Sequence, residues 1–227
     1  MTQARERILA SIRDGLVRAV LPDSGDARRP APAAPARAAD VDALAGQFSA
    51  ALTALSGRVY RATLADVSKV VAQIASECGA RTFLSWDDEA IGCPGLLDAL
   101  TASGLSRVAY EMPGDAGERI EVAERLGAVG LGVTGAHAAI AESGAIVLVS
   151  GPGRGRLPSL LPPVHVAVVP ERRLTPTFAD LVHAEPRLLD AGSNVVLVAG
   201  PSRTADIEMT LSHGVHGPKQ IHVILTR

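Results

Sequence analysis

At 227 residues the chain is long enough for one sizeable hydrophobic core, and this length favours one domain over two. Hydrophobic residues make up 47% of the sequence but aromatic residues only 3%, so few rings are present to stack nucleic-acid bases. The formal net charge of −2 gives no basic field that would attract nucleic acid or membrane lipid. We therefore expect an aliphatic core and no nucleic-acid partner.

The two cysteines, Cys78 and Cys93, form neither a disulfide framework nor a CxxC metal motif. An iron–sulfur cluster needs four ligands, usually thiolates, so these two cysteines cannot hold one. Residues 1–20 are amphipathic and charged, unlike a signal peptide, and no apolar run is long enough to cross a bilayer. The sequence therefore predicts a cytoplasmic protein without a membrane span.

The N-terminal segment has helical spacing of its apolar residues. They are Ile8, Leu9, Ile12, Leu16, Val17 and Val20, and Pro22 ends the pattern. Residues 23–39 are rich in Pro and Ala and are typical of a semi-extended linker. We predict a helical arm with its linker at 1–39 and a folded domain at 40–227. The apolar stripe of the arm is expected to dock on a partner subunit or on a second copy of the chain.

Helices and strands are predicted to alternate from Asp40 onward. Asp40 caps a helix that ends near Leu55. Further helices are predicted at 63–78, 94–103 and 116–126, each followed by a glycine, and strands at 58–61, 81–86, 107–110 and 128–133. Strands that alternate with helices indicate βαβ units and a parallel sheet.

The second half of the chain has a different pattern. Apolar runs at 145–150, 164–169, 194–199 and 220–226 predict strands, with little helix between the first two. Residues 175–189 predict a helix that Pro186 interrupts. We therefore expect an α/β fold with a mixed, largely parallel sheet flanked by helices.

The segment after the run at 194–199 is a candidate anion site. This run is predicted to be a buried strand that breaks at Gly200 and Pro201 and leads into Ser202, Arg203 and Thr204. Hydroxyls and an arginine at the carboxyl end of a strand suit a small carboxylate or phosphate. Alternatively, Arg203 forms an internal ion pair with Asp206 or Glu208.

Five stretches of the C-terminal half resemble the LUD-domain family, in particular its lactate-utilization protein C branch. They are 132–144 (GVTGAHAAIAESG), 161–165 (LPPVH), 193–194 (SN), 200–208 (GPSRTADIE) and 214–218 (GVHGP). The resemblance covers about residues 66–227, and the arm carries no part of it. Their order along the chain makes the resemblance more specific than any single stretch would be.

The resemblance implies a fold similar to that of ribose-phosphate isomerase and CoA transferases (the NagB/RpiA type). It also implies a role in the oxidation of L-lactate to pyruvate beside separate iron–sulfur proteins. Because this chain lacks cluster ligands, it would be the subunit without clusters, and its partners would carry the electrons. The resemblance names no redox cofactor for the chain.

Three further residues are candidates for the site. Glu142 is a candidate base on a turn of small residues, or alternatively a cap for backbone N–H groups. His216 is a candidate proton acceptor from a 2-hydroxy acid. Arg154 lies in a basic, glycine-rich loop that could cover an anion, dock an acidic partner or simply be solvated.

Metal binding by His213 and His216 is disfavoured, because Gly214 and Gly217 break the helical turn that their spacing would need. The glycines at 127–135 do not form a dinucleotide-binding fingerprint. The sequence thus predicts a lactate-oxidation subunit with an anion site. A stand-alone enzyme acting on an anionic metabolite and a non-catalytic assembly or regulatory subunit stay open as alternatives.

Overall fold

The computed structural model describes residues 2–18, 40–109, 115–204, 212–213 and 217–227. It divides into two units, Met1–Pro35 and Ala36–Arg227. The first contains helix α1 (Thr2–Arg18), as its apolar spacing predicts. The predicted linker at 23–39 lies outside the described residues.

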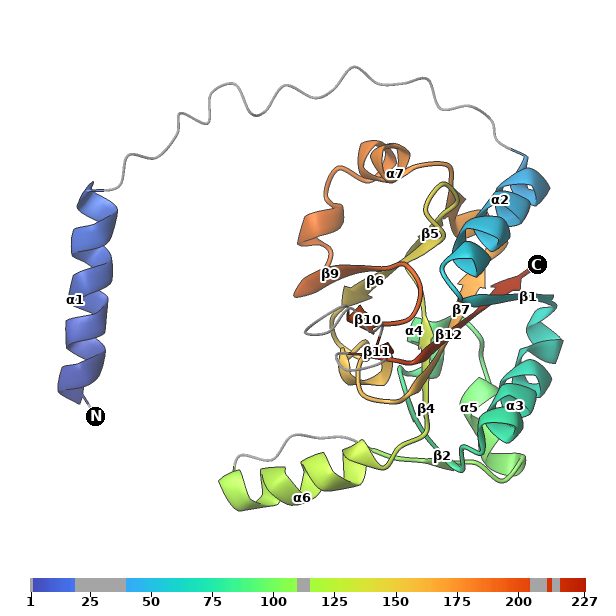
Figure 1. Cartoon of the computed structure of the whole chain (residues 1–227), viewed down its shortest axis with the longest axis horizontal. Helices are drawn as coiled ribbons and strands as arrows, with labels where there is room; N and C mark the ends of the chain where they lie inside the picture. The colour runs from blue at the N-terminus through green and yellow to red at the C-terminus, as the bar shows by residue number, and fades with distance from the viewer. Residues whose placement is uncertain (1, 19–39, 110–114, 205–211, 214–216) are drawn as a thin grey trace. The chain divides into compact units, whose positions relative to one another are not determined.

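The larger unit is built on a parallel sheet of six strands in the order β1-β12-β7-β4-β2-β3. β12, β7 and β4 run through the middle of this unit in Figure 1, and α2 and α3 lie beside β1. The strands are β1 (Arg58–Ala62), β12 (Gln220–Thr226), β7 (Val164–Pro170), β4 (Leu131–Gly135), β2 (Thr82–Ser85) and β3 (Ser106–Arg107).

A second sheet of four strands has the order β8-β5-β6-β9, and its β5–β6 and β6–β9 pairs are antiparallel. Its strands are β8 (Leu174–Thr175), β5 (Ala138–Ile140), β6 (Ala145–Ser150) and β9 (Asn194–Val198). A two-stranded ribbon pairs β10 (Arg203–Thr204) with β11 (Ser212–His213). The predicted α/β class is therefore confirmed, but the antiparallel pairs that the patterns place in one mixed sheet form a sheet of their own.

The apolar run at 194–199 was predicted to be a buried strand, and this prediction is wrong. β9 is an edge strand, and every residue in it is at least partly exposed; Leu197 is 44% exposed. An apolar run without alternation matches a fully buried strand and a half-buried edge equally well, because the pattern does not record how many neighbours the strand has.

Local capping chemistry explains where several helices begin and end. The Asp40 side chain accepts a hydrogen bond from the Asp42 N–H at the start of α2, and Gly79 ends α3 at φ 68°. Thr177 caps α7, which ends before Pro186, where the predicted helix was expected to be interrupted. The helices are α2 (Val41–Ala54), α3 (Val67–Cys78), α4 (Asp88–Ile91), α5 (Leu96–Ala102), α6 (Ala116–Gly127) and α7 (Phe178–Ala184). Four 3₁₀ turns accompany them, η1 (Leu64–Asp66), η2 (Leu157–Ser159), η3 (Glu171–Arg173) and η4 (Leu188–Asp190).

The core of the larger unit is largely aliphatic, and its buried side chains pack on both faces of the strands. Adjacent residues of β2 show the alternation: Phe83 packs in the cluster that includes α3 and α5, and Leu84 packs with residues of α6. In the second sheet, Ile146 faces the main core while Val147 packs in the cluster that contains residues of α7 and η4. β6 is therefore buried on both faces, which fixes the loop that follows it.

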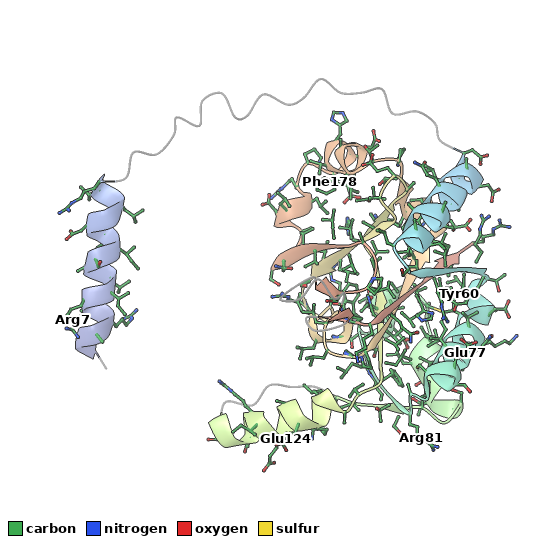
Figure 2. All side chains as sticks on the ribbon, viewed as in Figure 1. Arg7, Tyr60, Glu77, Arg81, Glu124 and Phe178 are labelled. Atoms are coloured by element: carbon green, nitrogen blue, oxygen red, sulfur yellow. The ribbon has the colours of Figure 1, made fainter. Side chains whose placement is uncertain are left out.

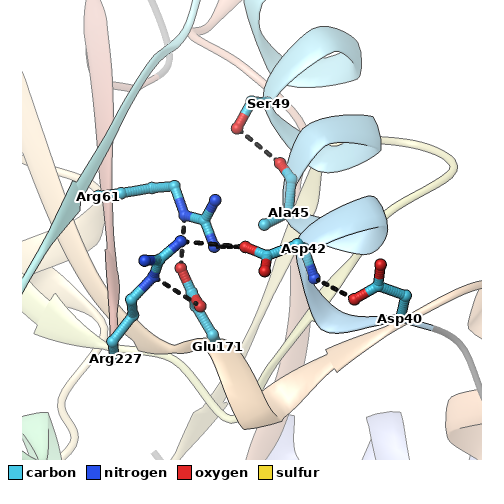
Figure 3. A network of polar contacts seen from close by, with 7 residues as sticks. All are labelled: Asp40, Asp42, Ala45, Ser49, Arg61, Glu171 and Arg227. Atoms are coloured by element: carbon cyan, nitrogen blue, oxygen red, sulfur yellow. Dashed lines mark hydrogen bonds and ion pairs between the residues drawn. The ribbon is translucent and has the colours of Figure 1, made fainter.

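Four charged side chains join the first helix of this unit to the C-terminal strand (Figure 3). Arg61 bonds to both Asp42 and Glu171, at 2.6 Å to Glu171, and Arg227 lies 3.0 Å from Asp42 and 3.5 Å from Glu171. Hydrogen bonds from Arg61 hold the pKa of the Asp42 carboxyl below its usual value. The network therefore links α2, β1, η3 and the end of β12.

Among the described residues no helix has the length and apolar character required to span a bilayer.

Candidate functional site

A cavity lies where the chain passes from the parallel sheet to the second sheet. Ala136 and His137 join β4 to β5, and Trp86 and Asp87 follow the neighbouring β2. The Trp86 N–H donates to the Val133 carbonyl at 3.0 Å, which holds the two strand ends together. Because these residues follow β2 and β4, the cavity lies at the carboxyl ends of adjacent parallel strands, where α/β sheets bind ligands. Its volume is about 690 Å³.

The glycine-rich loop after β6 forms another wall of this cavity. The Asp87 N–H donates to the Gly153 carbonyl at 3.1 Å, and the Trp86 indole N–H donates to the Gly155 carbonyl at 2.7 Å. Gly153 has φ 67°, and a Cβ there would lie 2.6 Å from an Asp87 carboxylate oxygen. The loop is therefore bound to the end of β2 and places Arg154 in the cavity wall.

His137, Glu185 and Arg173 form a connected polar group. His137 Nε2 lies 2.6 Å from one carboxylate oxygen of Glu185, and Arg173 lies 3.6 Å from the other. His137 and Arg173 line the cavity, and Glu185 stands at the end of α7. An ionised carboxylate only accepts hydrogen bonds, so Nε2 carries the proton of this pair.

The charges around the cavity differ in how they are compensated. Asp87 pairs with Arg107 at 3.2 Å, and Glu185 compensates Arg173. Among the described residues, no carboxylate forms an ion pair with Arg154, and Glu89 contributes a negative charge to the same wall. Arg154 is therefore the cation in this cavity with capacity for an added anion.

Glu142, predicted as a candidate base, lies away from this cavity. It is in the turn between β5 and β6, where Gly144 packs against α2, with Leu52 atoms 2.4 Å from where its Cβ would be. The exposed Glu142 carboxylate accepts a hydrogen bond from the Phe178 N–H at 3.3 Å (Phe178, on α7, is labelled in Figure 2). The structure therefore does not bring Glu142 and Arg154 together, and Glu142 makes the capping contact given above as its alternative.

The predicted anion segment lies at the other edge of the parallel sheet. The Ser202 N–H donates to the Pro218 carbonyl at 3.0 Å, just before β12 begins, and a Cβ on Gly200 would lie 2.9 Å from Leu55, just before β1. The segment follows the carboxyl end of β9, but β9 belongs to the second sheet, so the segment lies at the amino ends of β12 and β1 and not at the carboxyl ends of the parallel strands as expected. The backbones of Arg203 and Thr204 pair with β11.

His216, Asp206 and Glu208 lie outside the described residues. The roles predicted for His216, Ser202, Arg203 and Thr204 therefore stay predictions. Within the described ranges, no three His, Cys, Asp or Glu side chains gather as a metal site.

Sequence reasoning singled out Arg154, which lines this cavity, but did not propose Trp86, Asp87, His137 or Arg173 as site residues. The sequence did contain a signal for Trp86 and His137, because Trp86 ends one predicted parallel strand and His137 follows another. Such positions meet at one edge of the sheet. Arg173 and Glu185 follow β7 and α7, and no local pattern indicates that they approach His137.

Comparisons with known proteins agree with this architecture. The LUD domain matches residues 45–226. A lactate utilization protein C of Halalkalibacterium halodurans is 32% identical over 78% of this chain and 76% of its own length. A protein of the same name from Macrococcus caseolyticus is 32% identical over 69% of this chain and 66% of its own length.

A solved structure also has this fold. The crystal structure of a DUF162 family protein from Deinococcus radiodurans superposes with a TM-score of 0.61 at 22% identity, covering 83% of this chain and 99% of that one. The matched family spans most of the α/β unit described above, including every residue named in the cavity. The chain therefore belongs to the LUD-domain family.

Proposed function

We propose that this chain is a component of an L-lactate oxidation system, in which it binds a small carboxylate in the cavity between the two sheets. The observation that carries the proposal is Arg154, which lines the cavity and forms no ion pair with a carboxylate of the described residues. Arginine binds carboxylates through two parallel hydrogen bonds, which suits an anion of the size of lactate or pyruvate. Relatives named lactate utilization protein C support the choice of substrate.

The chain would act beside iron–sulfur proteins. Its two cysteines are too few for a cluster, so electrons from lactate would pass to a partner subunit. Arg203 with Ser202 and Thr204 would be a second anion contact at the other edge of the sheet. As a catalytic subunit, the chain would perform the chemistry itself. As an assembly subunit, it would position the substrate for a partner.

The N-terminal helix is the part of the chain that we propose for assembly. Ile8, Ile12 and Leu16 of α1 are 61%, 52% and 63% exposed, which leaves an apolar stripe to be covered. A chain lacking residues 1–39 should keep its thermal unfolding transition and lose mass in light scattering with its partners. An unchanged assembly would exclude this role for α1.

The proposal is tested by L-lactate consumption in a strain that lacks this gene and any other lactate route. Consumption should stop, and the native gene should restore it. Arg154→Ala, at equal protein level, should restore it poorly, whereas Arg156→Ala, an exposed arginine of the same loop outside the cavity wall, should restore it fully. Normal consumption in the deletion strain would contradict the pathway and favour a stand-alone enzyme on another anion.

A further inference from the structure

The pair of His137 and Glu185 has a defined hydrogen-bonding direction at the cavity. Because Glu185 accepts the proton of Nε2, the neutral imidazole has its lone pair on Nδ1. No described residue forms a hydrogen bond with Nδ1, although the His137 side chain is 19% exposed and lines the cavity. In this tautomer the neutral ring offers an acceptor at Nδ1 to a bound molecule.

The backbone around His137 fixes the position of this acceptor. The His137 N–H donates to the Val147 carbonyl of the buried strand β6 at 2.8 Å. Glu185 is held in turn by Arg173 and by the end of α7. A ring restrained on both its backbone and its Nε2 side has little freedom to turn its acceptor away, as expected for a group that selects a ligand.

We infer that His137 selects 2-hydroxy acids over other small carboxylates, with its Nδ1 accepting the hydrogen of the ligand's 2-hydroxyl while Arg154 holds the carboxylate. Glu185 is the positioning residue, since it keeps the proton on Nε2. This inference rests on the proposed function, because it assumes that the carboxylate binds beside Arg154.

The inference is tested by calorimetric titration of the full chain with L-lactate and with propionate, which lacks only the hydroxyl. One hydrogen bond to a neutral group is expected to make lactate bind about 3- to 10-fold more tightly than propionate. His137→Leu should bring the two affinities together and leave propionate binding near its native value. Retained propionate binding also shows that the variant is folded.

Glu185→Gln tests the positioning role. Because Arg173 lies beside the other Glu185 oxygen, the glutamine carbonyl should face Arg173 and its NH2 group should donate to Nε2, which moves the ring proton to Nδ1 and removes the acceptor. The lactate-to-propionate ratio should fall toward one, a change that a purely structural defect would not produce. His183→Leu, an exposed histidine on the same helix, is the matched control and should keep the native ratio.

The outcomes separate the two claims. If the native chain binds neither acid, the proposed function fails. If it binds both acids equally, or if His137→Leu keeps the native ratio, the selection by His137 is wrong while the carboxylate site stands.

Discussion

At the scale of single residues, the cavity wall contains Arg154, which can bind an anion, and Glu89, whose negative charge repels one. Glu89 is exposed and lines the same cavity as Arg154. Replacing it by glutamine removes a negative charge near the bound carboxylate. Glu89→Gln should therefore strengthen L-lactate binding about 2- to 5-fold at low salt, with the gain shrinking in 0.5 M salt. Calorimetry at the two salt concentrations checks this, and weaker binding by the variant would show that Glu89 itself contacts the ligand.

How much of the site could be predicted differs from residue to residue. Arg154 was identifiable because it lies in a local pattern, a basic glycine-rich loop after an apolar strand. His137 was visible only as part of a longer resemblance, and its partner Glu185 is 48 positions away. Their contact depends on where α7 packs against the second sheet, and the spacing of residues in the sequence does not reveal that packing.

At the scale of elements, the contact between β4 and η2 is expected to be sensitive to any added side chain. A Cβ on Gly132 of β4 would lie 1.7 Å from the Pro158 carbonyl oxygen, and neither strand nor turn can move far in a buried position. Gly132→Ala should destabilise the protein by about 3 kcal/mol. Gly46→Ala is the control, because it lies within α2 with no neighbouring atom within 4 Å and should stabilise by about 0.5–1 kcal/mol. Urea unfolding of both variants checks this; equal stability of Gly132→Ala and the native chain would contradict the packing described.

Elements with local signals were predicted well, and those defined by pairing were not. The Asp40 cap of α2 and the glycine that ends α3 follow from local chemistry and are confirmed. The three-residue strand β5 and the separation of the two sheets depend on distant partners. Strand pairing is decided by packing against these partners, which hydrophobic periodicity does not encode.

At the scale of the whole molecule, two buried histidines couple stability to pH. Burial lowers the pKa of His165 and of His222 to about 4, from an ordinary value of 6.5. As the pH falls below about 6.5 the unfolded chain takes up these protons first, so native stability is complete above pH 6.5 and is lost progressively toward pH 4. Each histidine should lower the free energy of unfolding by about 2 kcal/mol between pH 7.5 and pH 5.

Urea unfolding at the two pH values measures this loss. His165→Leu should be the less pH-sensitive protein by about 2 kcal/mol, because it has no buried imidazole on β7 to protonate. His183→Leu, which removes an exposed histidine, should keep the native pH dependence. An unchanged pH dependence in His165→Leu would show that His165 is not kept neutral by the fold.

The measurement that tests the central claim most directly is calorimetric titration of the purified full chain with L-lactate, comparing the native protein with Arg154→Ala and Arg156→Ala. A charge-assisted arginine–carboxylate contact predicts that Arg154→Ala weakens binding about 10- to 100-fold. Arg156→Ala, which removes the same charge from the same loop but does not line the cavity, should bind like the native chain. Equal affinities for all three proteins would contradict a carboxylate site at Arg154 and direct attention to Arg203 at the other edge of the sheet.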